Sequence, residues 1–199
     1  MQKDKTYDYS GRTNEGEGRF TSGECPLFLT SSAFLGNVKA NAKFDFTTAP
    51  MPYYPDAAGA PQNAIIGGAS LWVIGGKQAD EYKGVAKFFT YLSQPDIQAW
   101  WHQQTGYLPI TAASYKLTKE QGFYDKNPGS ETGVLELTGK APTENSRGLR
   151  LGNLVQIRDL WAEEIELALT GKKTPQAAMD DAVARGNAAL RTFEKTAGK

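Results

Sequence analysis

The sequence has a single cysteine and a single histidine among its 199 residues. One cysteine excludes a disulfide within this chain, so Cys25 is interpreted as a small apolar residue on a strand, with a partner outside this chain as the alternative. The lone His102 argues against a histidine-based metal centre and against a catalytic triad. No metal and no other cofactor is therefore expected.

Net charge and long apolar runs are also missing. The 22 basic residues balance 22 acidic ones, so no overall field attracts nucleic acid or an anionic membrane, and no nucleic-acid partner is expected. No apolar run reaches the roughly 18 residues that a membrane-spanning helix needs, and the N-terminus (MQKDKTYDYSGR) lacks the apolar core of a signal peptide. Two interpretations remain: a cytosolic protein, or a trimmed or truncated form of something larger.

What is present is the composition of a packed globular protein, with 40% hydrophobic and 11% aromatic residues. Strands are predicted at 25–29 (CPLFL) and around 43–48 (KFDFTT), with a helix between them. That order is a strand–helix–strand unit, which is typical of α/β domains. A proline-rich loop over 49–63 precedes AIIGGASLWVIGGK, where paired glycines between apolar runs predict two further strands.

Helical spacing of apolar residues dominates the remainder of the chain. A helix is predicted over about 79–92, and Pro95 separates it from a second helix that ends at Gly106. Trp100 and Trp101 lie on that second helix and are predicted to be in the core, because a helical stripe of aromatic residues usually is.

Two long helices close the chain. The first runs from about 153 to 170 and ends at Gly171, and the second is capped by Thr174 with Pro175 in its first turn. The stripes predicted to be buried consist of Leu154, Ile157, Trp161, Ile165 and Leu169 on the first helix and Met179, Ala182, Val183, Gly186, Leu190 and Phe193 on the second.

No catalytic arrangement can be identified, so the chain is predicted not to be an enzyme. GGASLWVIGGK resembles a phosphate loop, but Leu71 stands where the first glycine is required and Gln78 replaces the hydroxyl residue. The acidic clusters at 163–166 and 180–181 have the spacing of solvated helical faces. No nucleophile stands in a recognisable relation to a base.

Other residues favour binding of an anion, although none is specific alone. Ser31 stands at a helix start, where capping is the ordinary interpretation and anion binding the alternative. The pair Gly67 and Gly68 lets a backbone N–H approach a ligand closely, and Tyr107 follows a helix-ending glycine. Arg158 lies near the start of the first long helix, where a solvated cation is the ordinary interpretation.

Several long motifs resemble one family: APQNAIIGGASLW, GVAKFF, WHQQTGYLPIT, QGFYDKNPG, GLRLGN…QIR and TGKKTPQ. From about residue 17 onward, the chain is similar to the C-terminal half of the periplasmic glycerol-3-phosphate-binding proteins that feed an ABC importer. The resemblance implies an α/β fold of the two-lobed type II periplasmic-binding class, which includes maltose-binding protein. Residues 1–47 and 108–199 would belong to the C-terminal lobe, and residues 48–107, with hinge crossings, to the N-terminal lobe.

The same resemblance implies a ligand site at Ser31, Gly68, Tyr107 and Arg158. The ligand would be glycerol-3-phosphate or a glycerophosphodiester, the partners would be the permease subunits of the importer, and the location would be the periplasm. The family's N-terminal half has no counterpart in this chain, so as an incomplete C-terminal fragment it is expected to bind weakly. An incomplete sheet also favours strand exchange between copies.

Two alternatives to phosphate-ester binding stay open. The first is a carbohydrate receptor of the same superfamily, in which Trp72, Trp161 and tyrosines would stack on sugar rings. The second is a fragment that binds nothing and acts only as a folding or interaction module. The cation at Arg158 favours an anionic ligand over a sugar.

Overall fold

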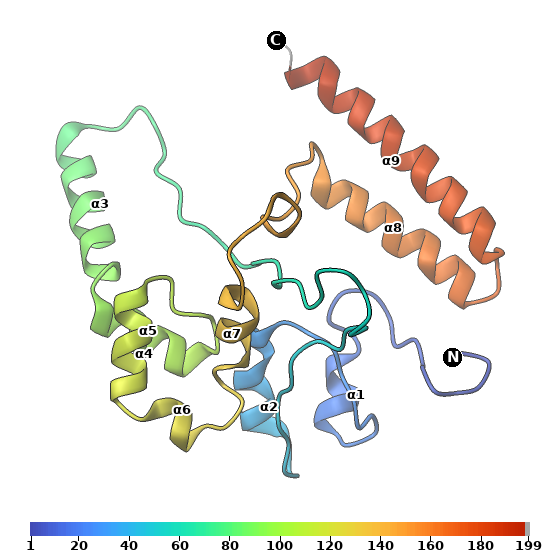
Figure 1. Ribbon diagram of the computed structural model, residues 1–199. Helices are drawn as coiled ribbons and strands as arrows, with labels where there is room; N and C mark the ends of the chain where they lie inside the picture. The colour runs from blue at the N-terminus through green and yellow to red at the C-terminus, as the bar shows by residue number, and fades with distance from the viewer. Residues whose placement is uncertain (198–199) are drawn as a thin grey trace. The chain divides into compact units, whose positions relative to one another are not determined.

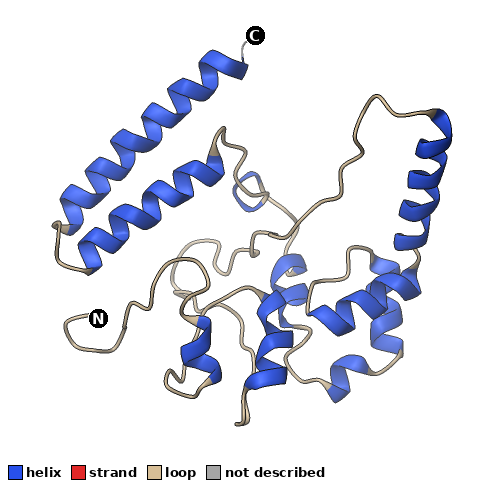
Figure 2. Cartoon of the chain, turned by 180° about the vertical axis from the view of Figure 1, so that it is seen from behind, coloured by secondary structure: helices blue, strands red, loops and turns tan. Residues whose placement is uncertain are grey.

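A computed structural model describes residues 1–197, with every side chain except that of Asn145. Within these residues all regular structure is helical (Figure 2). The elements are α1 (Glu17–Thr21), the 3-10 helix η1 (Ser32–Phe34), α2 (Leu35–Asn41), α3 (Ala79–Leu92), α4 (Pro95–Thr105), α5 (Ala112–Glu120), α6 (Phe123–Lys126), α7 (Thr132–Thr138), the 3-10 helix η2 (Glu144–Ser146), α8 (Leu154–Leu169) and α9 (Pro175–Ala197). Each described helix is too short or too polar to cross a membrane.

The chain divides into two compact units, which are described separately below. The first combines Met1–Phe20 with the segment from Leu149 onward, and the second is Thr21–Gly148. The lobe boundaries implied by the family resemblance stay a prediction.

In the first unit, α8 and α9 lie side by side as a helical hairpin (Figure 1). The turn between them begins at Gly171, whose φ of 75° lies in the left-handed region that favours glycine. The carbonyl of Leu167 accepts hydrogen bonds from the backbone N–H groups of Lys172 and Lys173, at 2.8 and 3.1 Å. Thr174 Oγ1 then accepts from Ala177 N at 3.2 Å, which confirms the predicted cap of the last helix.

The hairpin interface is built from small side chains. Those of α9 are Ala178, Ala182, Gly186 and Ala189, all buried. On α8, Ile157 is only 3% exposed, and a Cβ added at Gly186 would lie 3.7 Å from Ile157 Cγ2. The two helices therefore approach closely through their smallest residues.

The predicted buried stripes are confirmed at Ile157 but are wrong for five other large members. On α9, Met179, Val183 and Phe193 are 42%, 61% and 40% exposed, and on α8, Trp161 and Ile165 are 49% and 43% exposed. Periodicity gives the apolar arc of a helix but not the part of it that a neighbour covers. Here α9 turns its narrow alanine–glycine face to α8, and the larger side chains beside that face stay partly exposed in the described part of the unit.

One carboxylate inside the hairpin is paired with two cations. Glu164 is 2% exposed, and its two oxygens accept from Lys173 Nζ at 2.6 Å and from Arg185 Nη1 at 2.7 Å. The hydrogen bond from Lys173, followed by that from Arg185, lowers the pKa of Glu164 below its ordinary value of 4.5. The pair of cations thus holds the turn end of the hairpin only while Glu164 is ionised.

We expect Glu164→Gln to lower the melting temperature at about pH 7 and to reduce its acid sensitivity. A carboxylate whose pKa is lowered by folding adds stability above its unfolded pKa and loses it as the pH falls through the folded pKa. Thermal unfolding followed by circular dichroism between about pH 7 and pH 3 tests this. Glu194→Gln, at an exposed pair with Arg191, is the control. An unchanged acid slope in Glu164→Gln would contradict the assignment.

The second unit has a small core among α2, α4, α5, α6 and α7. Its buried residues are Phe34, Val38, Gln98, Ala99, His102, Ser114, Thr118, Tyr124, Ser130 and Val134. Pro95 opens α4 and Gly106, with φ of 78°, ends it, both as predicted. Trp100 and Trp101, predicted to be core, are instead 58% and 54% exposed. On α4 the buried polar residues are Gln98 and His102, so the helix turns this polar face, and not its tryptophans, toward the core.

The predicted strands are irregular chain without a ladder in the described residues. This holds for 25–29, 43–48 and 64–77, and Trp72 and Ile74 on the last segment are 88% and 73% exposed. A strand needs a neighbouring strand to satisfy its backbone groups, and none of the described segments supplies one. The α/β class is therefore not confirmed by residues 1–197, which are helical and irregular.

Candidate functional site

Ser31 caps the helix that follows it. Its backbone is extended, with φ of −67° and ψ of 145°, and Oγ accepts a hydrogen bond from Ala33 N at 3.3 Å. The capping interpretation is therefore confirmed. The residue is exposed, and a hydroxyl that accepts one hydrogen bond can still donate its own. Capping and ligand binding are thus compatible at this position.

Tyr107 is held by its backbone and presents its ring to solvent. Its N–H donates to Thr105 Oγ1 at 3.2 Å, and its carbonyl lies 2.5 Å from His102 Nδ1. The preceding Gly106 N–H donates to the carbonyl of His102 at 2.9 Å. The Tyr107 residue is 45% exposed, and its hydroxyl makes no hydrogen bond to the described part of the chain.

Gly68 lies against the ring of Tyr107. Its φ of 118° belongs to the region that side-chain-bearing residues rarely adopt. A Cβ added there would lie 3.8 Å from Tyr107 Cε1. The backbone at Gly68 therefore passes beside the tyrosine ring, although the two residues are distant in sequence.

The segment after Ser31 also reaches the turn that carries Tyr107. A Cβ added at Gly106 would lie 3.0 Å from the carbonyl oxygen of Ser32. The structure thus brings three predicted site segments, those of Ser31, Gly68 and Tyr107, into one neighbourhood of the second unit.

Arg158 belongs to the other unit, so its position relative to that neighbourhood stays a prediction. It lies in α8, five residues into a helix that begins at Leu154, and directly follows the buried Ile157. The residue is exposed, and its guanidinium forms no ion pair within residues 1–197. By contrast, Arg12 and Arg185 are engaged with carboxylates. Arg158 is therefore a cation without an internal partner near a helix N-terminus, where a bound anion is favoured.

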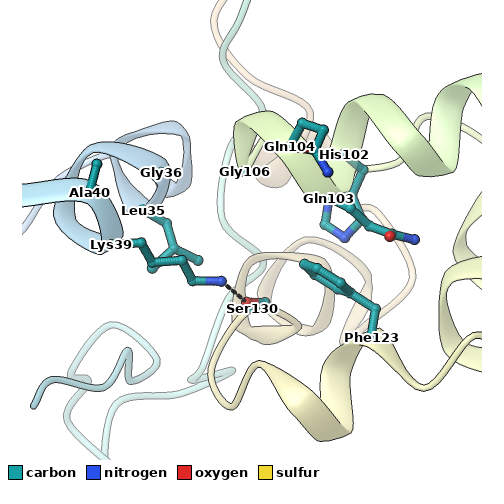
Figure 3. A pocket seen from close by; sticks show the side chains of 10 residues that line it. All are labelled: Leu35, Gly36, Lys39, Ala40, His102, Gln103, Gln104, Gly106, Phe123 and Ser130. Carbon is teal, nitrogen blue, oxygen red and sulfur yellow. Dashed lines mark hydrogen bonds between the residues drawn. The ribbon is translucent and has the colours of Figure 1, made fainter.

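A hollow of about 290 Å³ lies beside the C-terminal turn of α4 (Figure 3). Its lining consists of Leu35, Gly36, Lys39, Ala40, His102, Gln103, Gln104, Gly106, Phe123 and Ser130. Lys39 Nζ donates to Asn127 Oδ1 at 2.9 Å and to Ser130 Oγ at 3.4 Å, and burial lowers the pKa of Lys39. None of the four predicted site residues lines this hollow, which lies next to their segments at Leu35 and Gly106.

Residues 1–132 match the family of bacterial extracellular solute-binding proteins. The chain belongs to this family. Over 98% of its length it is 53% identical to the sn-glycerol-3-phosphate-binding periplasmic proteins UgpB of Pectobacterium atrosepticum and Escherichia coli K12. The resemblance read from the motifs is thereby confirmed. The chain spans 44% and 45% of these two relatives, less than half of their length.

A solved structure shows the same fold. It is the crystal structure of UgpB from Mycobacterium tuberculosis in complex with glycerophosphocholine, which is 22% identical to this chain with a TM-score of 0.72. The superposition covers 88% of this chain and 42% of that one. The likeness shows that this chain shares its fold with part of that structure.

His102 is the residue of this region that sequence reasoning missed. As the single histidine, it was considered in the sequence only for metal binding and catalysis. The sequence signal that could have revealed it is the spacing in WHQQTGY. A side chain in the last turn of a helix can reach forward to the carbonyl of the residue that follows a glycine C-cap.

Proposed function

We propose that this chain is part of the solute-binding component of an ABC importer and takes phosphate esters of glycerol as its ligand. The identity of 53% over 98% of the chain to proteins named for sn-glycerol-3-phosphate binding carries this proposal. The proposal places the chain in the periplasm, with permease subunits as partners and no catalytic role. It also places the chain in a two-lobed type II fold of the α/β class.

The proposed site uses charge-assisted hydrogen bonds. Ser31 Oγ and the hydroxyl of Tyr107 would donate to phosphate oxygens, Gly68 would offer a backbone N–H, and Arg158 would make a bidentate contact. Hydrogen bonds to a charged group are each worth about 1.5–3 kcal/mol. The neighbourhood of Ser31, Gly68 and Tyr107 in one unit supports the first three assignments.

The three predicted strand segments, 25–29, 43–48 and 64–77, suit a sheet that is completed by other strands. Leu27 in segment 25–29 is 75% exposed and Trp72 in segment 64–77 is 88% exposed. Such exposure is expected of strands whose partner strands are not among the described residues. We propose that they pair with the remainder of the two-lobed fold, and that strand exchange between copies is the alternative where that remainder is lacking.

A phosphodiester is the second candidate ligand, because the superimposable structure was solved with glycerophosphocholine. A diester carries one negative charge where a monoester carries up to two, so Arg158 contributes less to binding it. Competition between glycerol-3-phosphate and glycerophosphocholine, followed by phosphorus NMR, separates the two ligands.

We expect the isolated chain to bind glycerol-3-phosphate more weakly than micromolar. Association costs about 4–15 kcal/mol in lost freedom, and a chain that spans 44% of its relatives supplies only part of the contacts. Isothermal calorimetry tests the expectation, with maltose as an uncharged control. A low-micromolar dissociation constant for glycerol-3-phosphate would show that the chain carries a complete site.

A further inference from the structure

His102 is buried and both of its ring nitrogens have partners. The residue is 2% exposed. Nδ1 lies 2.5 Å from the carbonyl oxygen of Tyr107, and Nε2 lies 3.0 Å from the hydroxyl of Tyr124. The rings of Phe123 and Tyr124 pack against the imidazole at centroid distances of 5.7 and 5.6 Å, and Figure 3 shows His102 beside Phe123.

These partners assign the tautomer of the imidazole. A carbonyl oxygen can only accept, so Nδ1 carries the proton and donates it to Tyr107. In the neutral ring Nε2 then accepts, and the Tyr124 hydroxyl is its donor. Free histidine favours the opposite tautomer, with the proton on Nε2. The surrounding structure therefore selects the form that donates to Tyr107.

The groups around His102 keep the ring neutral. Burial is the main cause that lowers the pKa of His102 below 6.5. The hydrogen bond to the Tyr107 carbonyl opposes this shift, and the cation of Lys39 on α2 lowers the pKa further. From α6 the facing group is Tyr124, whose pKa is raised by burial. Tyr115 on α5 stacks beyond it at 5.8 Å and hydrogen bonds to Glu131. Of these groups, Lys39 is the charge that acts on the imidazole itself, and it disfavours a second cation there.

We propose that His102 is a positioning residue that fixes Tyr107 for the ligand. Tyr107 follows a left-handed glycine and is half exposed, so packing alone does not set its orientation. The bond from Nδ1 anchors its carbonyl while Thr105 Oγ1 anchors its N–H. Together they aim the ring at Gly68, on a segment that has no ladder of its own. The inference rests on the proposed function only for the role of Tyr107 as a ligand residue.

The tautomer is directly measurable because the chain has one histidine. Nitrogen NMR of the chain labelled at histidine should show a protonated Nδ1 and an unprotonated Nε2 near neutral pH. The opposite tautomer, or rapid exchange between the two, would overturn the proposal before any ligand is added.

Three variants separate positioning from simple packing. His102→Asn keeps an N–H donor close to the place of Nδ1, whereas His102→Leu removes that donor. Both variants remove Nε2, the acceptor for the Tyr124 hydroxyl. Tyr124→Phe removes the donor to Nε2 and leaves Nδ1 intact. A purely structural role predicts equal effects of the two His102 variants. Positioning predicts that the nuclear Overhauser contact between the Tyr107 ring and Gly68 survives in His102→Asn and Tyr124→Phe and is lost in His102→Leu.

Binding is then measured with glycerol-3-phosphate by phosphorus NMR at millimolar concentration. We expect affinity to fall about tenfold in His102→Leu, as for one lost hydrogen bond, and to stay near the wild-type value in the other two variants. A Tyr107–Gly68 contact that persists in His102→Leu overturns the proposal. If the contacts change as expected but neither the wild-type chain nor any variant binds at millimolar concentration, positioning stands and the proposed ligand site of this chain fails.

Discussion

Replacing Arg158 with methionine is expected to remove detectable binding of glycerol-3-phosphate. The guanidinium is exposed and has no ion-pair partner in residues 1–197, so its donors are free for a phosphate oxygen pair. Two hydrogen bonds to charge, at about 1.5–3 kcal/mol each, correspond to a loss of at least about a hundredfold in affinity. Line broadening of the ligand's phosphorus signal, recorded during titration, measures the change.

Matched variants make the Arg158 result specific. Arg191→Met removes an exposed guanidinium from α9 that is paired with Glu194, and it should leave binding unchanged. Arg158→Lys keeps the charge and loses the bidentate geometry, so an intermediate loss is expected. If the chain is instead a sugar receptor, Arg158→Met changes maltose binding little. Phosphate binding that is equal in Arg158→Met and wild type would exclude this arginine from the site.

Truncating Ile157 to alanine is expected to cost about 2–4 kcal/mol of unfolding free energy. The residue is 3% exposed and lies against Gly186, on the alanine–glycine face of α9. Those neighbours are alanine and glycine, which have no flexible side chains that can fill the cavity. The loss is measured from urea denaturation followed by circular dichroism of the helices.

The control for Ile157 lies on the same helix. Val155 is 72% exposed, so Val155→Ala should change the unfolding free energy by less than about 0.5 kcal/mol. Similar effects of the two substitutions would mean that α8 and α9 do not pack as described.

Local signals in the sequence predicted the helix ends well. Pro95, Gly106, Gly171 and Thr174 each mark a boundary in the structure. These residues act through their own backbone geometry or through a hydrogen bond within one turn. Such effects do not depend on what packs against the helix, so spacing alone reveals them.

Burial and strand pairing were not predictable in the same way. Trp100 and Val183 were assigned to the core and are 58% and 61% exposed. The segment 64–77 has the composition of a strand, yet it forms no ladder with any described segment. Both properties depend on a second segment, and an amphipathic pattern is equally consistent with a covered and an uncovered face.

In the candidate site, too, local features could be predicted from the sequence and contacts between distant residues could not. The cap at Ser31 followed from its place before a helix, and it is confirmed. The approach of Gly68 to Tyr107 joins residues far apart in sequence, and only the family resemblance anticipated it. The support of Tyr107 by His102 was not anticipated at all, because it needs a side chain to fold back across a helix terminus.

By itself, the sequence determined where the helices begin and end, that no disulfide forms within this chain, and to which family it belongs. Only the tertiary structure decided which face of each helix is covered and which ring nitrogen of the one histidine carries its proton. Turn and cap preferences depend on a few adjacent residues, whereas burial and tautomer are set by groups that meet only after the chain has folded.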